Sequence, residues 1–454
     1  MNKKDFQIFD NYKKENKAEM VYLDSAASSL TPDYVVNKMN EYYFDYRSNI
    51  DRGLYKSAIK ATYEYEESRK KIARFTNAND EDIIFTSSST DSSNKLIFML
   101  EKYLFCKKEE SSNINRTKII NKKEILVSTY SHHSDLVPLQ ELANRNNLKI
   151  ILCKNEEDFI NHISENTLIL SCVHASNVTG QIFDVKSIFA KAKSVSKSIF
   201  TICDMTASAG HIKINIKDLG CDAAYFGAHK MCGPTGIGAL YIKREIMREM
   251  LPASYGGGMV WEVSDESSTF RSDIKLFEAG TGNIAGVIGF GAAVDYINNL
   301  GKEKNIKEEE GNLVKENKFG LEIIRSHTKE VLNYALSELS KLEESGLVKL
   351  FTEKNIEKNI GIISFEVYKK SKDFDSKNLN INAKSISSIH PHDVAQILAD
   401  NHAAVRSGHH CAQPLMRELC VPALTRASFY FYNTKDDVDA LIINLKKVQN
   451  IFSR

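Results

Sequence analysis

The chain has little of what would place it in a membrane, a secreted scaffold or a nucleic-acid complex. No apolar run is long enough to span a bilayer, and the best candidate, 285–294, is short and rich in glycine. Eight cysteines are too sparse for a disulfide framework, and none forms a CxxC pair. A formal charge of +1 gives no long-range field for a polyanion. We therefore expect no nucleic-acid partner, no membrane and no bound metal.

The N-terminal segment, 1–17, carries lysines with no apolar stretch behind them, which excludes a secretory signal. Sparse cysteine usage fits a reducing compartment, so we expect a cytoplasmic protein. Cys153, Cys172 and Cys203 end or interrupt apolar strand-like runs, and we expect them to be buried and inert. With 42% hydrophobic and 26% charged residues the chain is typical of a globular protein.

Apolar runs alternate with stretches of helical spacing along the first two thirds of the chain. Most of the runs are apolar throughout, as in strands buried on both faces of a parallel sheet. The alternation therefore predicts an α/β domain with helices on both sides of the sheet. The expected strands are 82–86, 124–129, 148–153, 167–173, 199–204, 223–227 and 238–242, and the expected helices are 35–46, 61–75, 136–144 and one from about 91.

The pattern changes near residue 296. A charged helical stretch, 298–344, is followed by short strands and helices that predict a smaller α+β domain. We expect a large domain over 21–295 and a small C-terminal domain over 296–454, with residues 1–20 packed against the small domain. Two further segments, 101–123 and 368–388, are rich in Lys, Asn and Ser, and we expect surface insertions there.

Two residues at the ends of neighbouring strand patterns suggest cofactor chemistry. Lys230 follows a strand in YFGAHKMCGPTGIGALYI (225–242), and a lysine in a dry site forms Schiff bases. A surface lysine before a turn is the alternative. Asp204 ends the strand IFTICD, where a carboxylate can keep a pyridine nitrogen protonated. A helix N-cap is the alternative for this aspartate.

Two polar turns follow other strands. Ser89 and Thr90, in FTSSSTDSSN (85–94), offer an anion site at a helix N-terminus, with simple capping as the alternative. His132, in TYSHHSDLVPLQ (129–140), could stack on an aromatic cofactor and move protons near neutral pH. The adjacent histidines alone are too few ligands for zinc.

The segment AAVRSGHHCAQPLM (403–416) has the composition of a reactive-thiol loop. Cys411 lies beside two histidines and Arg406, and cationic neighbours favour the thiolate form of a cysteine. A buried structural cysteine is the alternative, which the polar surroundings disfavour. Arg426, in LTRASFY, can offer a bidentate fork to a carboxylate.

Together these motifs resemble the pyridoxal-phosphate enzymes of the class V aminotransferase superfamily, and more narrowly the SUF-type (group II) cysteine desulfurases and selenocysteine lyases. The resemblance covers residues 22–434, and its most discriminating part is the cysteine loop. It implies a fold-type I transferase, with a large domain built on a mostly parallel sheet between helices and a smaller α+β C-terminal domain. The segments that carry it are YLDSAASS, FTSSSTDSSN, SHHSDLVP, HASNVTGQ, GAHKMCGPTGIGALY, GGGMV, FEAGTGN, VRSGHHCAQPLM and RASFYFYNT.

The resemblance also implies a role for each matching residue. The residues of the pyridoxal phosphate site are Lys230 as the Schiff-base lysine, Asp204 at the pyridine nitrogen, His132 stacked on the ring, Asn177 at the ring oxygen or the substrate carboxylate, Ser89, Thr90 and His229 at the phosphate, and Thr281 reaching the phosphate from a partner subunit. Arg426, with Asn177 and Arg406, would bind the substrate, and Cys411 would accept its sulfur.

The implied reaction converts L-cysteine to L-alanine and leaves a persulfide on Cys411, which passes to an acceptor protein for iron–sulfur cluster assembly. His392, in IHPHDVAQIL, would help engage a small zinc-containing acceptor, although a surface histidine at a helix start is the alternative. A homodimer is implied as well. Two other functions stay open: a related carbon–sulfur or carbon–selenium lyase, and a catalytically altered homologue that serves as an assembly partner.

The chain departs from the family pattern at several positions, and Ala207 and Gly227 stand where the family usually contacts the cofactor. Ala207 stands in place of a glutamine, Gly227 in place of a serine, Gly282 in place of a proline and Asp51 in place of a histidine. A neutral hydrogen bond contributes ~0.5–1.5 kcal/mol net, so each loss weakens cofactor binding only modestly. We therefore expect a functional pyridoxal enzyme.

Overall fold

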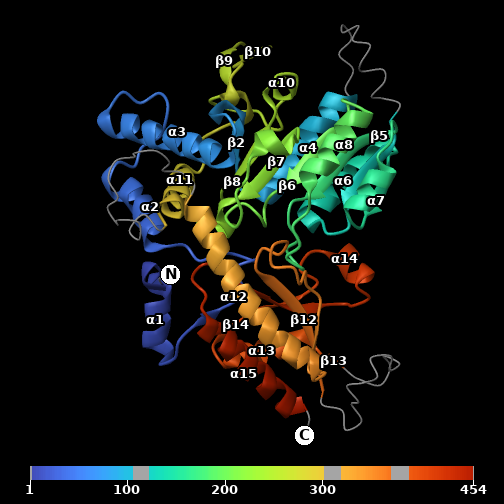
Figure 1. Cartoon of the computed structure of the whole chain (residues 1–454). Helices are drawn as coiled ribbons and strands as arrows, with labels where there is room; N and C mark the ends of the chain where they lie inside the picture. The colour runs from blue at the N-terminus through green and yellow to red at the C-terminus, as the bar shows by residue number, and fades with distance from the viewer. Residues whose placement is uncertain (1–2, 106–121, 301–318, 370–387, 453–454) are drawn as a thin grey trace, which may run out of the picture. The chain divides into compact units, whose positions relative to one another are not determined.

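The computed structural model describes residues 3–105, 122–300, 319–369 and 388–452 (Figure 1). Most of the two expected insertions, 101–123 and 368–388, and the first part of the charged stretch from 298 lie outside these ranges. No helix within them combines the length and the apolar character that crossing a membrane requires.

The chain forms two compact units. The small unit comprises Met1–Pro32, Ala175–Ile182 and Gly301–Arg454. The large unit comprises Asp33–His174 and Phe183–Leu300. The domain boundaries read from the sequence, 21–295 and 296–454, stay a prediction, and the units group 21–32 and 175–182 with the C-terminal part of the chain.

A seven-stranded sheet forms the centre of the large unit, in the order β2-β8-β7-β6-β5-β3-β4. The strands from β7 to β4 run parallel, whereas β8 is antiparallel to both of its neighbours. The mostly parallel sheet is confirmed. The sequence analysis did not predict that β8 is antiparallel. The loop that joins β7 to β8 is short, and a parallel strand would need a longer crossover connection. The strands are β2 (Ile83–Thr86), β3 (Glu124–Ser128), β4 (Lys149–Cys153), β5 (Thr167–Val173), β6 (Phe200–Asp204), β7 (Ala223–Gly227) and β8 (Gly238–Ile242).

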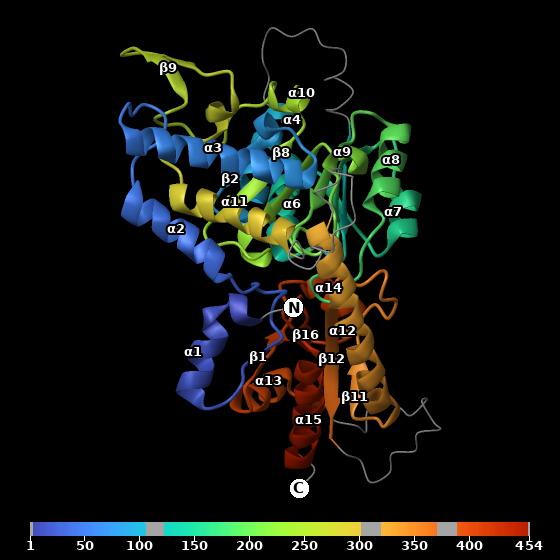
Figure 2. The same ribbon diagram turned by 60° about the vertical axis from the view of Figure 1, so that its left-hand side comes forward.

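Helices flank this sheet (Figures 1 and 2). Helices α4 and α6 pack on each other, with α4 against β7 and β8 and α6 against β3 and β4, and α8 contacts β5 and β6. Helix α11 is buried along most of its length against α2 and α3. All the expected helices of this unit are confirmed, and α7, α8, α9, α10 and α11 are additional. The helices are α2 (Asp33–Asp45), α3 (Lys56–Thr76), α4 (Ser89–Phe105), α6 (His133–Asn146), α7 (Glu156–His162), α8 (Val185–Val195), α9 (Ile216–Leu219), α10 (Arg244–Met247) and α11 (Ile284–Asn299).

The strand directions place the candidate site at one edge of the sheet. β3, β6 and β7 run parallel, and β2 shares their direction because both it and β7 are antiparallel to β8. All four strands therefore end at the same edge, where ligands bind in open α/β sheets. A separate hairpin, β9 (Val260–Val263) with β10 (Ser268–Phe270), and two short 3₁₀ turns, η3 (Ala228–Lys230) and η4 (Ile274–Phe277), complete this part of the unit.

The small unit has the expected α+β architecture. Its antiparallel sheet has the order β11-β12-β16-β15, with β13 paired to β12, while β1 pairs with β14. Helices α12 and α15 pack on each other and cover an apolar core that includes Phe365 and Phe429. The elements are α1 (Gln7–Asn16), β1 (Val21–Tyr22), α12 (Phe319–Glu344), β11 (Val348–Leu350), β12 (Ile362–Tyr368), β13 (Ser388–Ile389), α13 (Pro391–Asp400), β14 (Ala403–Ala404), β15 (Arg406–Gly408), α14 (Gln413–Glu418), β16 (Leu424–Ser428) and α15 (Lys435–Phe452).

Candidate active site

Lys230 lies in the turn that follows the buried strand β7. Together with His229 it forms the end of η3, and both side chains are half-buried. Burial and the positive charge of Lys230 lower the pKa of His229 to about 4. His229 is therefore neutral at neutral pH and offers a hydrogen bond rather than a charge.

Asp204 ends β6, the strand beside β7, and its Cα pairs with that of Tyr225. The backbone N–H of Thr206 donates to its Oδ1 atom at 2.8 Å. Burial and then the charge of Asp135 raise the pKa of Asp204 to about 6, and the positive charge of Lys230 acts in the opposite direction. The two predicted cofactor residues thus lie at or just beyond the ends of adjacent parallel strands. With this raised pKa the carboxyl group of Asp204 can take up and release a proton near neutral pH.

Ser89 begins α4 and faces the turn that carries Lys230. Its Oγ atom is buried and has no hydrogen-bond partner within the described part of the chain. A Cβ atom built on Gly227 would lie 2.9 Å from this oxygen and 2.9 Å from Nδ1 of His229. Ser89, Gly227 and His229 therefore meet at one place. A buried hydroxyl without a partner at a helix N-terminus fits a phosphate oxygen.

His132 is the N-cap of α6, and its Nδ1 atom accepts a hydrogen bond from the backbone N–H of Ser134 at 3.1 Å. The Oγ atom of Ser134 lies 2.8 Å from Oγ1 of Thr90, the second residue of α4. This contact joins the N-terminal turns of the two helices. The structure thereby brings His132 to the same sheet edge as Thr90.

Ala207, where the family pattern has a glutamine, follows Asp204 in a buried turn. The neighbouring Ser208 hydroxyl lies 3.0 Å from Nδ1 of His174. Burial lowers the pKa of His174 to about 4. The neutral His174 and the hydroxyl of Ser208 therefore satisfy each other.

Thr281 lies in the loop between η4 and α11. Its Oγ1 atom is 3.4 Å from Nδ2 of Asn49, and both residues line a cavity of about 620 Å³. The lining includes Arg52 and Lys275 but not Lys230 or Asp204. Within the large unit, Thr281 is therefore not brought together with the other predicted cofactor residues.

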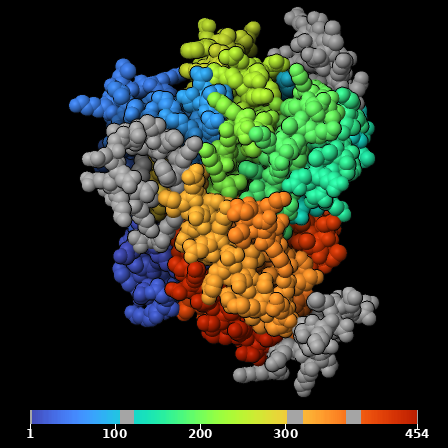
Figure 3. Space-filling model, in the orientation of Figure 1, coloured from blue at the N-terminus to red at the C-terminus, as the bar shows by residue number. Residues whose placement is uncertain are grey.

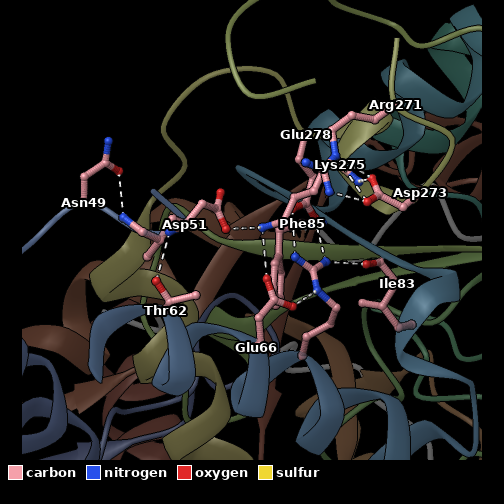
Figure 4. Close-up of polar contacts among 12 residues, drawn as sticks. Asn49, Asp51, Thr62, Glu66, Ile83, Phe85, Arg271, Asp273, Lys275 and Glu278 are labelled. Atoms are coloured by element: carbon pink, nitrogen blue, oxygen red, sulfur yellow. Dashed lines mark hydrogen bonds and ion pairs between the residues drawn. The ribbon is translucent and has the colours of Figure 1, made fainter. Parts of the chain in front are cut away.

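A charged network anchors the Thr281 loop, and sequence reasoning did not find it (Figure 4). The buried guanidinium of Arg69 pairs with Glu278, which lies three residues before Thr281, and Lys275 pairs with Glu66. The only sequence signal for this network was Glu278, the acidic residue within FEAGTGN. Its partner, Arg69 in α3, is more than 200 positions away in the chain.

In the small unit, Cys411 occupies the loop between β15 and α14 with a left-handed backbone, φ 54°. His410 before it is also left-handed, φ 51°, which is unusual for residues other than glycine. The backbone N–H of Cys411 donates to Nδ1 of His409 at 3.1 Å. The side chain of Cys411 is half-buried, whereas Cys153, Cys172 and Cys203 are fully buried as predicted.

Arg406 and Arg426 lie side by side as Cα partners on β15 and β16. Both contact the carboxylate of Asp24: Arg406 at 2.8 Å through Nη2 and Arg426 at 3.3 Å through Nη2. Asp24 belongs to the quoted segment YLDSAASS, but it was not among the predicted site residues. Burial lowers the pKa of Arg426 to about 10. The Nε–H of Arg426 is buried and has no acceptor among the described residues.

Asn177 connects Arg426 to the cysteine loop. Its carbonyl accepts from Nη1 of Arg426 at 2.8 Å, and its Nδ2 atom donates to the carbonyl of His410 at 2.9 Å. Four predicted residues of the small unit, Asn177, Arg406, Cys411 and Arg426, therefore belong to one connected cluster. His392 is elsewhere, exposed at the start of α13, with its ring 5.0 Å from that of His390.

The chain is similar to proteins of a known family. The chain matches the family model described as aminotransferase class-V over residues 21–317 and 312–441. It is 36% identical to a probable cysteine desulfurase of Halalkalibacterium halodurans, covering 99% of this chain and 98% of the relative. A probable cysteine desulfurase of Streptomyces coelicolor is 33% identical, at 99% and 97% coverage.

Solved structures give the same result. The apo structure of a cysteine desulfurase from Thermococcus onnurineus NA1 superposes with a TM-score of 0.80 at 31% identity, covering 100% of this chain and 98% of that one. An Escherichia coli cysteine desulfurase superposes with a TM-score of 0.74 at 29% identity and 95% coverage of both chains. The chain belongs to the aminotransferase class-V family, among relatives named as cysteine desulfurases.

Proposed function

We propose that the chain is a pyridoxal-phosphate-dependent cysteine desulfurase. The observation that carries this proposal is the buried carboxyl group of Asp204 on β6 beside the strand that leads to Lys230. The partnerless hydroxyl of Ser89 next to His229 supports it, because it fits the phosphate of the same cofactor. The relatives named as cysteine desulfurases support the choice of substrate.

The residues of the large unit would hold the cofactor as follows. Lys230 would bind it covalently, Asp204 would hold a proton on the ring nitrogen, and His132 would lie against the ring. Ser89, Thr90 and His229 would hold the phosphate, with a neutral His229 donating one hydrogen bond. When bound, pyridoxal phosphate supplies an electron sink for the α-carbon of an amino acid.

The residues of the small unit would act on the amino acid. Arg426 has a buried donor to spare for the substrate carboxylate, and Asn177 and Arg406 fix its surroundings. The thiolate of Cys411 would attack the sulfur of L-cysteine, so that an S–S bond forms as the C–S bond breaks. Together with a proton delivered to the carbon side, this yields L-alanine and a persulfide on Cys411. Lys230 would move that proton.

We also propose a homodimer in which Thr281 completes the partner's phosphate site. Large apolar side chains remain exposed on α2, on α3, in the loop between these helices and on the β9–β10 hairpin of the large unit. Leu54 of that loop is 91% exposed and Trp261 of the hairpin is 68% exposed. In the space-filling view the side chains of α3 and of this hairpin lie at the surface (Figure 3). Apolar side chains exposed to this extent are typical of protein–protein contacts.

The sulfur acceptor and the cellular setting complete the proposal. His392 is exposed at the start of α13, which fits a contact with an acceptor protein such as a small zinc-containing one. Cys411 would pass its persulfide to that acceptor for iron–sulfur cluster assembly in the cytoplasm.

The test is to incubate purified protein with L-cysteine and a reductant and to measure alanine and sulfide. Cys411→Ala should retain the yellow colour of the bound cofactor and lose sulfide release. Cys420→Ala is the matched control, because Cys420 is the exposed cysteine of the same unit and has no proposed role. Equal sulfide release by wild type and Cys411→Ala would refute the role of Cys411. Colourless wild-type protein that takes up no pyridoxal phosphate would refute the whole proposal.

A further inference from the structure

Asp135, in the first turn of α6, is a buried carboxylate that the reaction described above does not use. Its side chain is 1% exposed and accepts three hydrogen bonds. Ser131 Oγ donates to Oδ2 at 2.7 Å, and Ser171 Oγ and Tyr225 OH each donate to Oδ1 at 2.8 Å. A carboxylate this deeply buried is costly unless its oxygens are satisfied, and these three hydroxyls satisfy it.

Each of these donors belongs to a segment that leads to a candidate site residue. Ser131 immediately precedes His132. Tyr225 lies in β7, is the Cα partner of Asp204 and lies five residues before Lys230. Ser171 lies in β5, which pairs with β6 along the strand that ends at Asp204. One side chain therefore fixes the His132 turn against the strands that carry the carboxylate and the lysine.

Burial raises the pKa of Asp135 and its three hydroxyl donors lower it, but none of these donors neutralises the negative charge of its carboxylate. That charge acts on the groups around it and, after burial, is the largest influence that raises the pKa of Asp204. The surrounding titratable groups that respond to Asp135 are Asp204, Tyr225, Cys172 and Cys203.

We propose that Asp135 is a positioning residue of the cofactor site: its carboxylate holds the His132 turn against β7 and adds negative charge behind Asp204. The additional charge strengthens the binding of a ring that carries a proton on its nitrogen, because a cation is attracted by both carboxylates. This inference rests on the proposed use of pyridoxal phosphate.

The test is Asp135→Asn, which keeps the size of the side chain and removes its charge. Protein stripped of cofactor is titrated with pyridoxal phosphate, and the dissociation constant is measured from pH 6 to pH 9 together with the pH midpoint of the bound cofactor's absorbance. We expect the dissociation constant to rise by roughly three- to tenfold, since one pKa unit of lost interaction is a factor of ten. We also expect the absorbance midpoint to move to lower pH, because the protonated ring loses a stabilising charge.

Asp218→Asn makes the same chemical change at an exposed aspartate of the large unit, and should leave both quantities unchanged. If Asp135→Asn does not fold, Tyr225→Phe is tested instead. It removes one of the hydrogen-bond donors to Asp135 and should shift the pH midpoint of the bound cofactor's absorbance. A dissociation constant within twofold of wild type and an unchanged midpoint, in whichever variant folds, would overturn the inference. Wild-type protein that binds no pyridoxal phosphate would instead overturn the proposed function.

Discussion

The guanidinium of Arg69 faces the carboxylate of Glu278 through two parallel hydrogen bonds, 2.7 Å from Nη1 to Oε1 and 2.8 Å from Nη2 to Oε2. Oε1 of Glu278 also accepts from the backbone N–H of Phe85 at 2.7 Å, and Nη1 of Arg69 donates to the carbonyl of Ile83. The pair therefore connects α3, the strand that leads to Ser89 and the loop that carries Thr281.

Arg69→Ala should reduce the free energy of unfolding by about 3–5 kcal/mol, because it leaves the mostly buried Glu278 without its cation. Urea unfolding of the apoprotein measures this. Arg145→Ala is the matched control, since Arg145 makes a similar paired contact with Glu101 but is 51% exposed. It should cost no more than ~1 kcal/mol. Equal losses of unfolding free energy in the two variants would contradict the prediction that a buried ion pair contributes more than an exposed one.

Gly227→Ser should not restore the serine contact of the family pattern. Its Cβ atom would lie 2.9 Å from both Ser89 Oγ and His229 Nδ1, so one of these side chains must move. We expect weaker binding of pyridoxal phosphate, measured by equilibrium titration of the stripped protein. Gly256→Ala is the control, because its Cβ atom would meet neighbours only at ordinary contact distance, 3.6 Å. Tighter binding by Gly227→Ser would show that the turn adapts.

Asp204 should make the stability of the apoprotein fall as the pH rises between about 4 and 6. Burial and the charge of Asp135 raise its pKa in the folded state to about 6, so the folded protein binds this proton more tightly than the unfolded chain does. The contribution is complete below the unfolded pKa and is lost as the pH passes the folded one, on the order of 3 kcal/mol in all. Asp204→Asn removes this titration. The difference in free energy of unfolding between wild type and Asp204→Asn, measured from pH 4 to pH 8, should therefore change across this window and be flat above pH 7.

Arg426→Lys should raise the KM for L-cysteine by roughly tenfold or more, because an ammonium cannot replace the planar fork of a guanidinium. Steady-state kinetics measures this change. Arg417→Lys, at the surface of α14, is the control and should leave KM unchanged. The retained charge next to Asp24 keeps the protein folded, and an unaltered KM for Arg426→Lys would place the substrate carboxylate elsewhere.

Much of the fold was predictable because its signals are local. The apolar runs from 167 to 173 and from 223 to 227 are strands with every residue buried, as their composition predicted. The additional helix α8 was missed because its apolar positions are interrupted by lysines, although Asp184 caps it. The antiparallel direction of β8 follows from the short loop between β7 and β8. Hydrophobic periodicity alone predicts a strand but not its direction.

The sequence by itself singled out Lys230, Asp204, Arg426 and Cys411 as the residues that we propose to carry chemistry, because each stands in a motif that resembles the family pattern. Tertiary structure decided their environments. It alone showed that Asp24 lies between two arginines, that the buried Asp135 contacts Tyr225 on the strand beside Asp204 and that Glu278 is held by Arg69. The physical reason is that desolvation and charge pairing depend on contacts between residues far apart in the chain, which no local pattern records.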